Sequence, residues 1–284
     1  MKLETDRSFP PELQSLVVAA NARLAESRTV ERMWACDHRL WKQDPTDIAN
    51  RLGWLTIVEY MKDRAEDLLT FAASAKKRGI RDMVLLGMGG SSLGPEVLRA
   101  TFGPSNGFPR LWVLDSTVPG WIQQVTQAID PARSLFILAS KSGGTIEVMS
   151  LFAHFWELVQ KTPGHQGGEQ FIAITDPGTG LERLAVEHGF WRIFTNPPDI
   201  GGRYSVLSYF GLVPAVLMGI DVVRLITRAT AMAQACRTQS PLERNPGADL
   251  GATMASLAQA GRNKITLISS PQIAAFGLWA EQLL

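Results

Sequence analysis

Glycine and hydroxyl residues dominate two short stretches of the sequence, and each follows an apolar run. The first, GMGGSSLGP, covers residues 87–95, and the second, SKSGGTIE, covers residues 140–147. A turn of this kind between a strand and a helix brings hydroxyls, backbone N–H groups and the positive end of the helix dipole together, which suits a terminal phosphate dianion. The hydroxyl residues concerned are Ser91, Ser92, Ser140, Ser142 and Thr145. The alternative is that these side chains only cap helices.

A third stretch, DIGGRYSVLS at residues 199–208, places Arg203 behind two glycines and just before an apolar helix expected to start near Ser205. An arginine at such a position can stabilise an anion that forms during a reaction. The alternative is an arginine that merely covers a helix end.

The first turn also allows a dinucleotide site. Gly87 and Gly89 begin a glycine turn after an apolar run, and Asp115 ends the next run, where a ribose-binding acid belongs. Ser92 occupies the place of the third fingerprint glycine, and no lysine follows Gly90 as a P-loop requires. An NAD-dependent oxidoreductase therefore remains an alternative, although a pyrophosphate needs only one such turn and the sequence has two.

These turns can be positioned by strands that alternate with helices along the chain. Short apolar runs, each ending in Gly, Asp, Ser or Thr, predict strands at residues 82–87, 110–115, 134–140, 170–176 and 190–195. Helical stretches between them indicate a parallel sheet covered on both faces, with the turns at its carboxyl edge. Residues 11–78 show helical periodicity, and residues 204–221 predict a buried helix. Further on, we expect a strand at 264–270 and an amphipathic helix at 271–284.

Composition excludes several classes of protein. The chain has 284 residues, of which 45% are hydrophobic, and a net charge of +1 without a basic block, so neither nucleic acid nor an anionic membrane is an expected partner. Two distant cysteines, Cys36 and Cys236, and four histidines without ligand spacing predict no disulfide framework and no metal site. The N-terminus lacks the apolar core of a signal peptide, and no apolar run reaches 18 residues, which indicates a cytoplasmic protein.

Four stretches in sequence order, GMGGSSLGP, SKSGGTIE, GGRYSVLSYFGL and GLWAEQLL, resemble the successive signatures of the glucose-6-phosphate isomerase family. The stretch MWACDHRLWKQDPTDIANRLGWL further resembles the isomerase half of bacterial proteins in which transaldolase and this isomerase are fused. The resemblance implies an α/β fold with a three-layer sugar-isomerase domain built on a five-stranded parallel sheet. We expect a helical segment at 1–79, this domain at 80–222, and linker helices with the start of a second such domain at 223–284.

The resemblance also implies roles for individual residues. Gly90 and Ser91 would line the sugar-phosphate site, and Gln282 would reach the ligand. Ser140, Lys141, Ser142 and Thr145 would hold the phosphate, with Ser142 standing where many relatives have threonine. Arg203 would stabilise the enediolate formed as glucose 6-phosphate and fructose 6-phosphate interconvert. The family needs no metal or organic cofactor, and its partners would be a sugar-phosphate substrate and, in the complete protein, a second copy in a homodimer or a fused transaldolase domain.

The last residues depart from the family pattern. The family motif runs W-x-E-Q-L-x-x-E-S, and its second glutamate is the catalytic base, whereas here WAEQLL ends at Leu284. Glu281 matches the first glutamate and lies about 140° around the helix from the second, so we do not assign it the role of base. We expect a C-terminally truncated chain that binds substrate but is inactive alone. A noncatalytic sugar-phosphate-binding regulator is the other alternative, although the sequence has no basic DNA-binding helix.

Overall fold

The computed structural model describes residues 9–238 and 241–284, which form two compact units. One unit contains the chain up to Ala49 together with Arg228–Ile268, and the other contains Asn50–Thr227 together with Ser269–Leu284. The larger second unit carries the sheet and all the candidate site residues, so its architecture matters most here.

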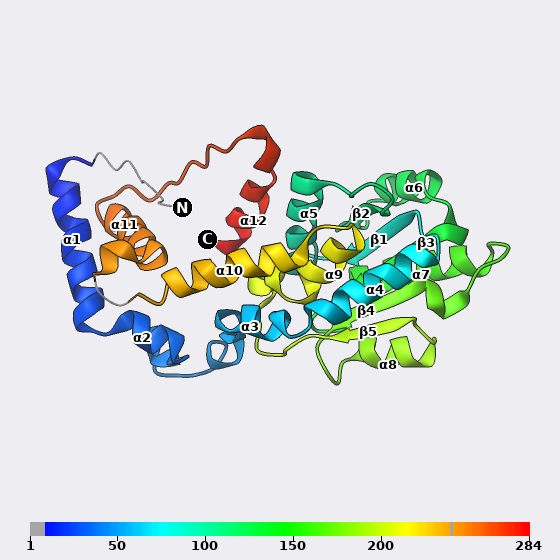
Figure 1. Ribbon diagram of the computed structural model, residues 1–284, viewed down its shortest axis with the longest axis horizontal. Coiled ribbons are helices and arrows are strands. Elements are labelled where there is room, and N and C mark those ends of the chain that lie inside the picture. The colour runs from blue at the N-terminus through cyan, green and yellow to red at the C-terminus, as the bar shows by residue number, and fades with distance from the viewer. Residues whose placement is uncertain (1–8, 239–240) are drawn as a thin grey trace. The chain divides into compact units, whose positions relative to one another are not determined.

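Five parallel strands form the sheet of this unit (Figure 1). They are β1 (Asp82–Gly87), β2 (Arg110–Leu114), β3 (Ser134–Ala139), β4 (Phe171–Thr175) and β5 (Arg192–Thr195), in the order β2-β1-β3-β4-β5. All five lie within the stretches predicted from the sequence, and the predicted parallel α/β fold is confirmed. Because β1 pairs with both β2 and β3, it is an interior strand, and all of its residues are buried.

Helices cover both faces of the sheet. The helices that follow β1 to β4 are α5 (Gly90–Phe102), α6 (Pro119–Ala128), α7 (Ile146–Gln160) and α8 (Gly180–Glu187). Side chains of β1 alternate between two core clusters, with Met83 and Leu85 in one and Val84 and Leu86 in the other. This alternation follows from the two-residue period of a strand, and it produces the three-layer arrangement.

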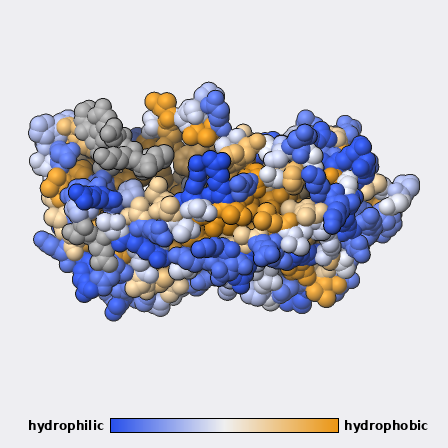
Figure 2. Space-filling model, viewed as in Figure 1, coloured by the Kyte–Doolittle hydropathy of each residue, from blue (hydrophilic) through white to orange (hydrophobic). Residues whose placement is uncertain are grey.

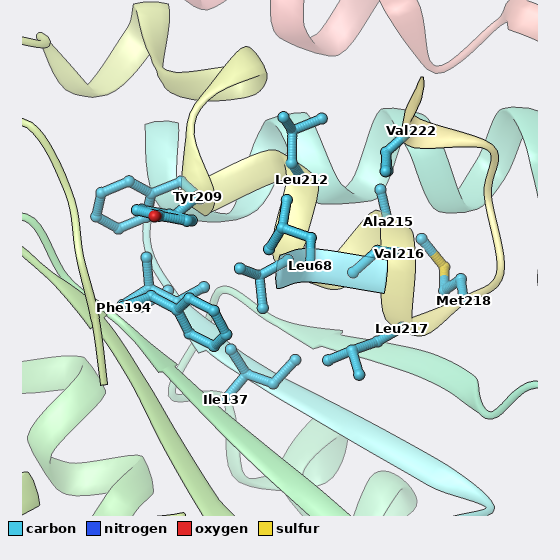
Figure 3. Packing of buried hydrophobic residues seen from close by; sticks show 14 of the residues in the cluster. Leu68, Ile137, Phe194, Tyr209, Leu212, Ala215, Val216, Leu217, Met218 and Val222 are labelled. Atoms are coloured by element: carbon cyan, nitrogen blue, oxygen red, sulfur yellow. The ribbon is translucent and has the colours of Figure 1, made fainter. Parts of the chain in front are cut away.

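The first core cluster is completed by helices α3 (Ile57–Lys62), α4 (Ala65–Lys77) and α9 (Tyr209–Leu217). Every residue of α9 is buried, as expected for a helix that is apolar all round. Figure 3 shows Leu212 and Val216 of α9 close to Leu68 of α4, with Ile137 of β3 and Phe194 of β5 below them. The α-helix begins at Tyr209, later than the predicted start near Ser205, because residues Gly202–Leu207 form a 3-10 helix and the Ser208 hydroxyl caps α9 by accepting from the Phe210 amide.

The other unit is helical. It contains α1 (Pro11–Glu26), α2 (Thr29–Trp34), α11 (Pro246–Gln259) and the end of α10 (Val222–Ala235). Asn21 of α1 donates a buried hydrogen bond of 3.0 Å to Asp249 of α11, and the Asn245 side chain caps α11 by accepting from the Ala248 amide. The helical periodicity predicted for residues 11–78 is thus confirmed for α1 to α4, which short 3-10 helices connect.

The strand predicted at residues 264–270 is wrong. This stretch has no regular secondary structure, and the Ile268 side chain is 95% exposed. A strand needs a neighbour for its backbone N–H and C=O groups, and no strand within the described residues pairs with this stretch. After it come a 3-10 helix at Pro271–Ile273 and the short helix α12 (Phe276–Leu283), in place of the single helix expected from residue 271.

The face drawn in Figure 2 mixes hydrophilic residues with scattered hydrophobic ones, as is common on protein surfaces. None of the described helices is both long and apolar enough to cross a membrane.

Candidate functional site

The site residues gather where the strand order changes direction. From β1 the chain moves outward to β2 and then returns to the other side of β1 to form β3, so the switch point lies between β1 and β3. Ligands of open α/β sheets bind at the carboxyl ends of the strands at such a point. Gly87 and Ala139, the last residues of the two strands, are register partners. Both glycine and hydroxyl turns therefore leave the same edge of the sheet, side by side.

Two positions of the turn after β1 favour glycine, one because of its backbone conformation and one because of close packing. Gly89 has a φ of 54° and precedes α5, where its conformation favours glycine. A Cβ atom on Gly90 would lie 2.1 Å from the carbonyl oxygen of Gly202, so this turn touches the loop that carries Arg203. Ser91 follows in the first turn of α5 and is buried. Its Cβ lies 3.3 Å from the Cβ position of Gly87, which is also 3.3 Å from the Ala139 carbonyl of the neighbouring strand.

The turn after β3 is organised by hydroxyl groups. The hydroxyls of Ser140 and Thr145 lie 2.8 Å apart, and the Gly143 amide donates to the Ser140 hydroxyl at 3.1 Å. Ser142 is exposed, and its hydroxyl accepts from the Gly144 amide at 3.4 Å. The structure therefore brings Ser140 and Thr145 into contact and places Ser142 beside them.

Thr145 stands at the N-cap of α7 but does not cap it. Its side chain makes no hydrogen bond to a helix amide, because its hydroxyl is turned toward Ser140. The first N–H groups of a helix have no acceptor within the helix, and with the dipole they favour an anion. This arrangement differs from a simple capping role, in which the threonine hydroxyl would accept from these amides itself. The N-terminus of α7 can thus receive an anion next to two hydroxyls.

The Lys141 ammonium group contacts residues that follow the next two strands. It forms an ion pair with Asp176, directly after β4, and donates a hydrogen bond of 2.7 Å to the carbonyl of Pro198, beyond β5. Lys141 and Asp176 are both half-buried. The structure thus places the Lys141 backbone in the turn, while its side chain joins three segments of the carboxyl edge.

Asp176 was given no role from the sequence. Burial raises the pKa of its carboxyl group above the ordinary value, while the hydrogen bond and charge of Lys141 oppose that shift. Its Oδ1 atom is buried and has no hydrogen-bond partner within the described residues. The sequence did contain a signal for Asp176. It ends the predicted strand at residues 170–176, and residues at or just after the ends of neighbouring parallel strands, such as Lys141 and Asp176, meet at the same edge of the sheet.

The loop that carries Arg203 is held from two sides. The Gly53 amide donates to the Asp199 carbonyl at 2.9 Å, and the Trp54 and Tyr204 rings stack with their centroids 5.4 Å apart. On the other side, the Ser205 hydroxyl donates to the carbonyl of Gly90 at 3.1 Å or of Gly202 at 2.7 Å.

Arg203 itself is exposed. Its guanidinium makes no ion pair in the part of the chain that the structure describes. It is therefore available to an anionic ligand.

Helix α12 brings one further predicted residue to the first turn. The Nε2 atom of Gln282 lies 2.9 Å from the Cβ position of Gly89, whereas Glu281 is exposed. The Gln282 Oε1 atom is buried and lacks a hydrogen-bond partner among the described residues. Within residues 9–238 and 241–284, no three His, Cys, Asp or Glu side chains form a group that could hold a metal ion.

A five-stranded parallel sheet between helices, with two hydroxyl-rich turns at its switch point, has the three-layer fold of sugar-isomerase domains. The sequence matches the family described as phosphoglucose isomerase over residues 2–261, and the chain belongs to this family.

Individual relatives agree with this assignment. A glucose-6-phosphate isomerase of Citrifermentans bemidjiense is 32% identical over 72% of this chain and 39% of its own length. One from Symbiobacterium thermophilum is 31% identical over 87% of this chain and 57% of its own. The chain thus spans about half the length of the curated relatives that it matches.

Solved structures show the same fold. A hypothetical protein of Thermus thermophilus superposes with a TM-score of 0.75 at 26% identity, covering 96% of this chain and 62% of that one. A glucose-6-phosphate isomerase of Chlamydia trachomatis also gives a TM-score of 0.75, at 21% identity, over 98% of this chain and 56% of the other.

Proposed function

We propose that this chain binds glucose 6-phosphate and fructose 6-phosphate and forms the phosphate-binding part of a glucose-6-phosphate isomerase. The observation that carries the proposal is the uncapped N-terminus of α7, where Thr145 contacts Ser140 and leaves the helix amides to a ligand. Membership of the phosphoglucose isomerase family and the names of the relatives support the choice of a sugar phosphate as that ligand.

In this proposal the phosphate occupies the turn after β3, with Ser140, Ser142 and Thr145 donating hydroxyls and α7 donating amides. Gly90 and Ser91 line the sugar, since the turn after β1 lies beside the phosphate turn, and Gln282 contacts the ligand from α12. Lys141 contributes its backbone to the phosphate turn. Binding energy from the phosphate, remote from the reacting carbons, then holds the sugar chain in place for reaction.

Arg203 is proposed to act on the reacting end of the sugar. Interconversion of an aldose and a ketose moves a proton between C1 and C2 and passes through an enediolate, whose negative charge needs a partner. Arg203, whose backbone amide nitrogen lies 2.8 Å from the Cβ position of Gly90, would supply that partner, since its exposed guanidinium forms no ion pair within the described residues and its planar fork can donate to both enediolate oxygens.

The base that moves the proton is not assigned within residues 1–284. Glu281 is exposed on α12 and is not proposed for this role. A positioned general base contributes about 100- to 10,000-fold to a rate. We therefore propose that the chain alone binds substrate but turns it over very slowly.

Calorimetric titration tests the proposal, with fructose 6-phosphate, fructose, inorganic phosphate and NADH as separate ligands. We expect fructose 6-phosphate to bind, inorganic phosphate to bind more weakly and compete with it, and fructose and NADH not to bind. Binding of NADH without binding of the sugar phosphate would contradict the proposal and favour a dinucleotide site at Gly87, Gly89 and Asp115. Normal turnover by this chain in a coupled assay would show that it contains the base, with Glu281 as the first candidate.

A further inference from the structure

The Lys141 side chain connects the phosphate turn to the loop that carries Arg203. It leaves the turn after β3, meets the Asp176 carboxylate after β4, and donates to the carbonyl of Pro198. Backbone hydrogen bonds connect the same segments. The Asp176 amide donates to the Lys141 carbonyl at 3.4 Å, and the Asn196 amide donates to the Thr175 carbonyl at 2.8 Å. One ammonium group and these backbone bonds thus connect the phosphate turn with residues 196–203.

The contact to Pro198 matters because of where it lies along the loop. Beyond it, the loop is held at Asp199 by Gly53, at Ile200 by a bridge to Leu52, and near Gly202 by the turn after β1. Lys141 adds an anchor from the side of the phosphate. Without it, only the backbone hydrogen bonds at Asp176 and Asn196 would connect the beginning of the loop to the turn where the phosphate is proposed to bind.

Asp176 and a phosphate bound in the turn would compete for the Lys141 ammonium group. A phosphate dianion bound at residues 140–145 carries more negative charge than a carboxylate. Lys141 belongs to that turn, so its ammonium group would be attracted to the phosphate. An ammonium group has three N–H donors on a flexible stem, so it moves to the strongest acceptor within reach. The half-buried Asp176 carboxylate already pairs with Lys141, so it would oppose the attraction of the phosphate and favour the position of the ammonium group beside Pro198.

We propose that Asp176 is a positioning residue that holds Lys141 on the Pro198 carbonyl and thereby fixes the loop that carries Arg203 while the phosphate turn is occupied. The identity of the ligand rests on the proposed function, whereas the contact between Asp176, Lys141 and the loop does not. The inference leads to an unusual expectation. Removing the charge of Asp176 should strengthen anion binding and loosen the arginine loop at the same time.

Two variants separate this role from a merely structural one. Asp176→Asn removes the carboxylate charge, and Lys141→Met removes the ammonium group. Glu157→Gln is the matched control, because it removes a carboxylate from an exposed ion pair with Lys161 toward the other end of α7. Each protein is titrated with inorganic phosphate, and hydrogen exchange of the peptide covering residues 196–204 is followed by mass spectrometry.

We expect both variants to accelerate exchange of residues 196–204 by about threefold or more, as for a segment that opens more often. Phosphate affinity should rise about two- to fivefold in Asp176→Asn, since an ion pair near the surface is worth this much, and should fall in Lys141→Met. The control should change neither quantity. Lys141→Arg, which keeps the cation, should retain most of the protection of the loop.

Unchanged exchange in both folded variants would overturn the inference, and so would a loss of phosphate affinity in Asp176→Asn. If Lys141→Met does not fold, Lys141→Arg and Asp176→Asn decide the question by the same readouts. If the unsubstituted chain binds neither phosphate nor a sugar phosphate, the proposed function fails, and the exchange of residues 196–204 still tests the contact that Asp176 maintains.

Discussion

Gly90 and Gly202 approach each other so closely that a Cβ atom on Gly90 would lie 2.1 Å from the Gly202 carbonyl oxygen and 2.8 Å from the Arg203 amide nitrogen. The turn after β1 and the loop of Arg203 are therefore packed backbone against backbone. The neighbouring atoms belong to the main chain, so they cannot move aside as a flexible side chain would.

Gly90→Ala is expected to force the two loops apart. Overpacking of this kind costs about 1–3 kcal/mol of the free energy of unfolding. Because the displaced loop carries Arg203, binding of fructose 6-phosphate should weaken as well. Urea unfolding and calorimetric titration measure the two effects. The control is Gly120→Ala in α6, where nothing lies within 4 Å of the added methyl group and stability should stay within about 0.5 kcal/mol. Equal results for both variants would contradict the close approach at Gly90.

Ser140→Ala and Ser142→Ala should behave differently although both remove a hydroxyl from the same turn. Ser140 is buried and accepts from the Gly143 amide, so its loss should lower both stability and phosphate affinity. Ser142 is exposed, so its loss should leave unfolding almost unchanged while weakening phosphate binding by about 1–3 kcal/mol. Ser142→Thr keeps the hydroxyl and should bind normally. Unaltered phosphate binding in Ser142→Ala would remove this residue from the site.

Arg203→Ala should affect a charged mimic of the enediolate more than it affects the substrate. A sugar-phosphate analogue with a carboxylate in place of C1 and C2 should lose about 1.5–3 kcal/mol of binding, the range for hydrogen bonds to charged groups. Fructose 6-phosphate should lose much less. Lysine should restore only part of the difference, because it cannot reproduce the planar fork. Equal losses for both ligands would make Arg203 a simple binding residue. Stability should not change, since the side chain is exposed.

The buried phenol of Tyr209 should make the folded chain less stable at alkaline pH. Burial raises the pKa of its phenol above the ordinary value of 10.0, and neighbouring Tyr60 raises it further. The folded chain therefore keeps this proton more tightly than the unfolded chain. The resulting stabilisation is complete below pH 10.0 and is lost as pH rises from there through the higher pKa of the folded state.

Tyr209→Phe keeps the ring among its buried neighbours (Figure 3) but removes the ionisable group. Its free energy of unfolding should decline less steeply above pH 10.0 than that of the unsubstituted chain. Urea unfolding at several pH values measures both slopes. Parallel declines would show that Tyr209 does not contribute to the alkaline loss.

The sheet could be predicted because each strand, such as Asp82–Gly87 or Ser134–Ala139, is a buried apolar run. The same pattern failed at residues 264–270, where an apolar run has no neighbouring strand in the described chain and Ile268 stays exposed. Apolar composition indicates that a segment can be buried, but a strand also needs a neighbouring strand to pair with its backbone N–H and C=O groups. The start of α9 was predicted near Ser205 instead of at Tyr209, because periodicity does not distinguish an α-helix from the 3-10 helix at Gly202–Leu207.

In the candidate site, the turns could be located from glycine and hydroxyl residues, because local sequence largely determines local turn geometry. The contact of Gly90 with Gly202 and that of Lys141 with Asp176 and Pro198 could not, because they join segments distant in sequence. The sequence predicted that Lys141 lies in the turn. It could not predict the direction of the Lys141 side chain, which depends on Asp176 after the next strand.

The most direct test of the proposed function is a crystal structure of this chain soaked with fructose 6-phosphate. We expect the phosphate oxygens within hydrogen-bonding distance of the hydroxyls of Ser140, Ser142 and Thr145 and of the first amides of α7, and the oxygens of C1 and C2 facing Arg203. A phosphate bound elsewhere, or a sugar turned so that C1 and C2 point away from Arg203, would contradict the account.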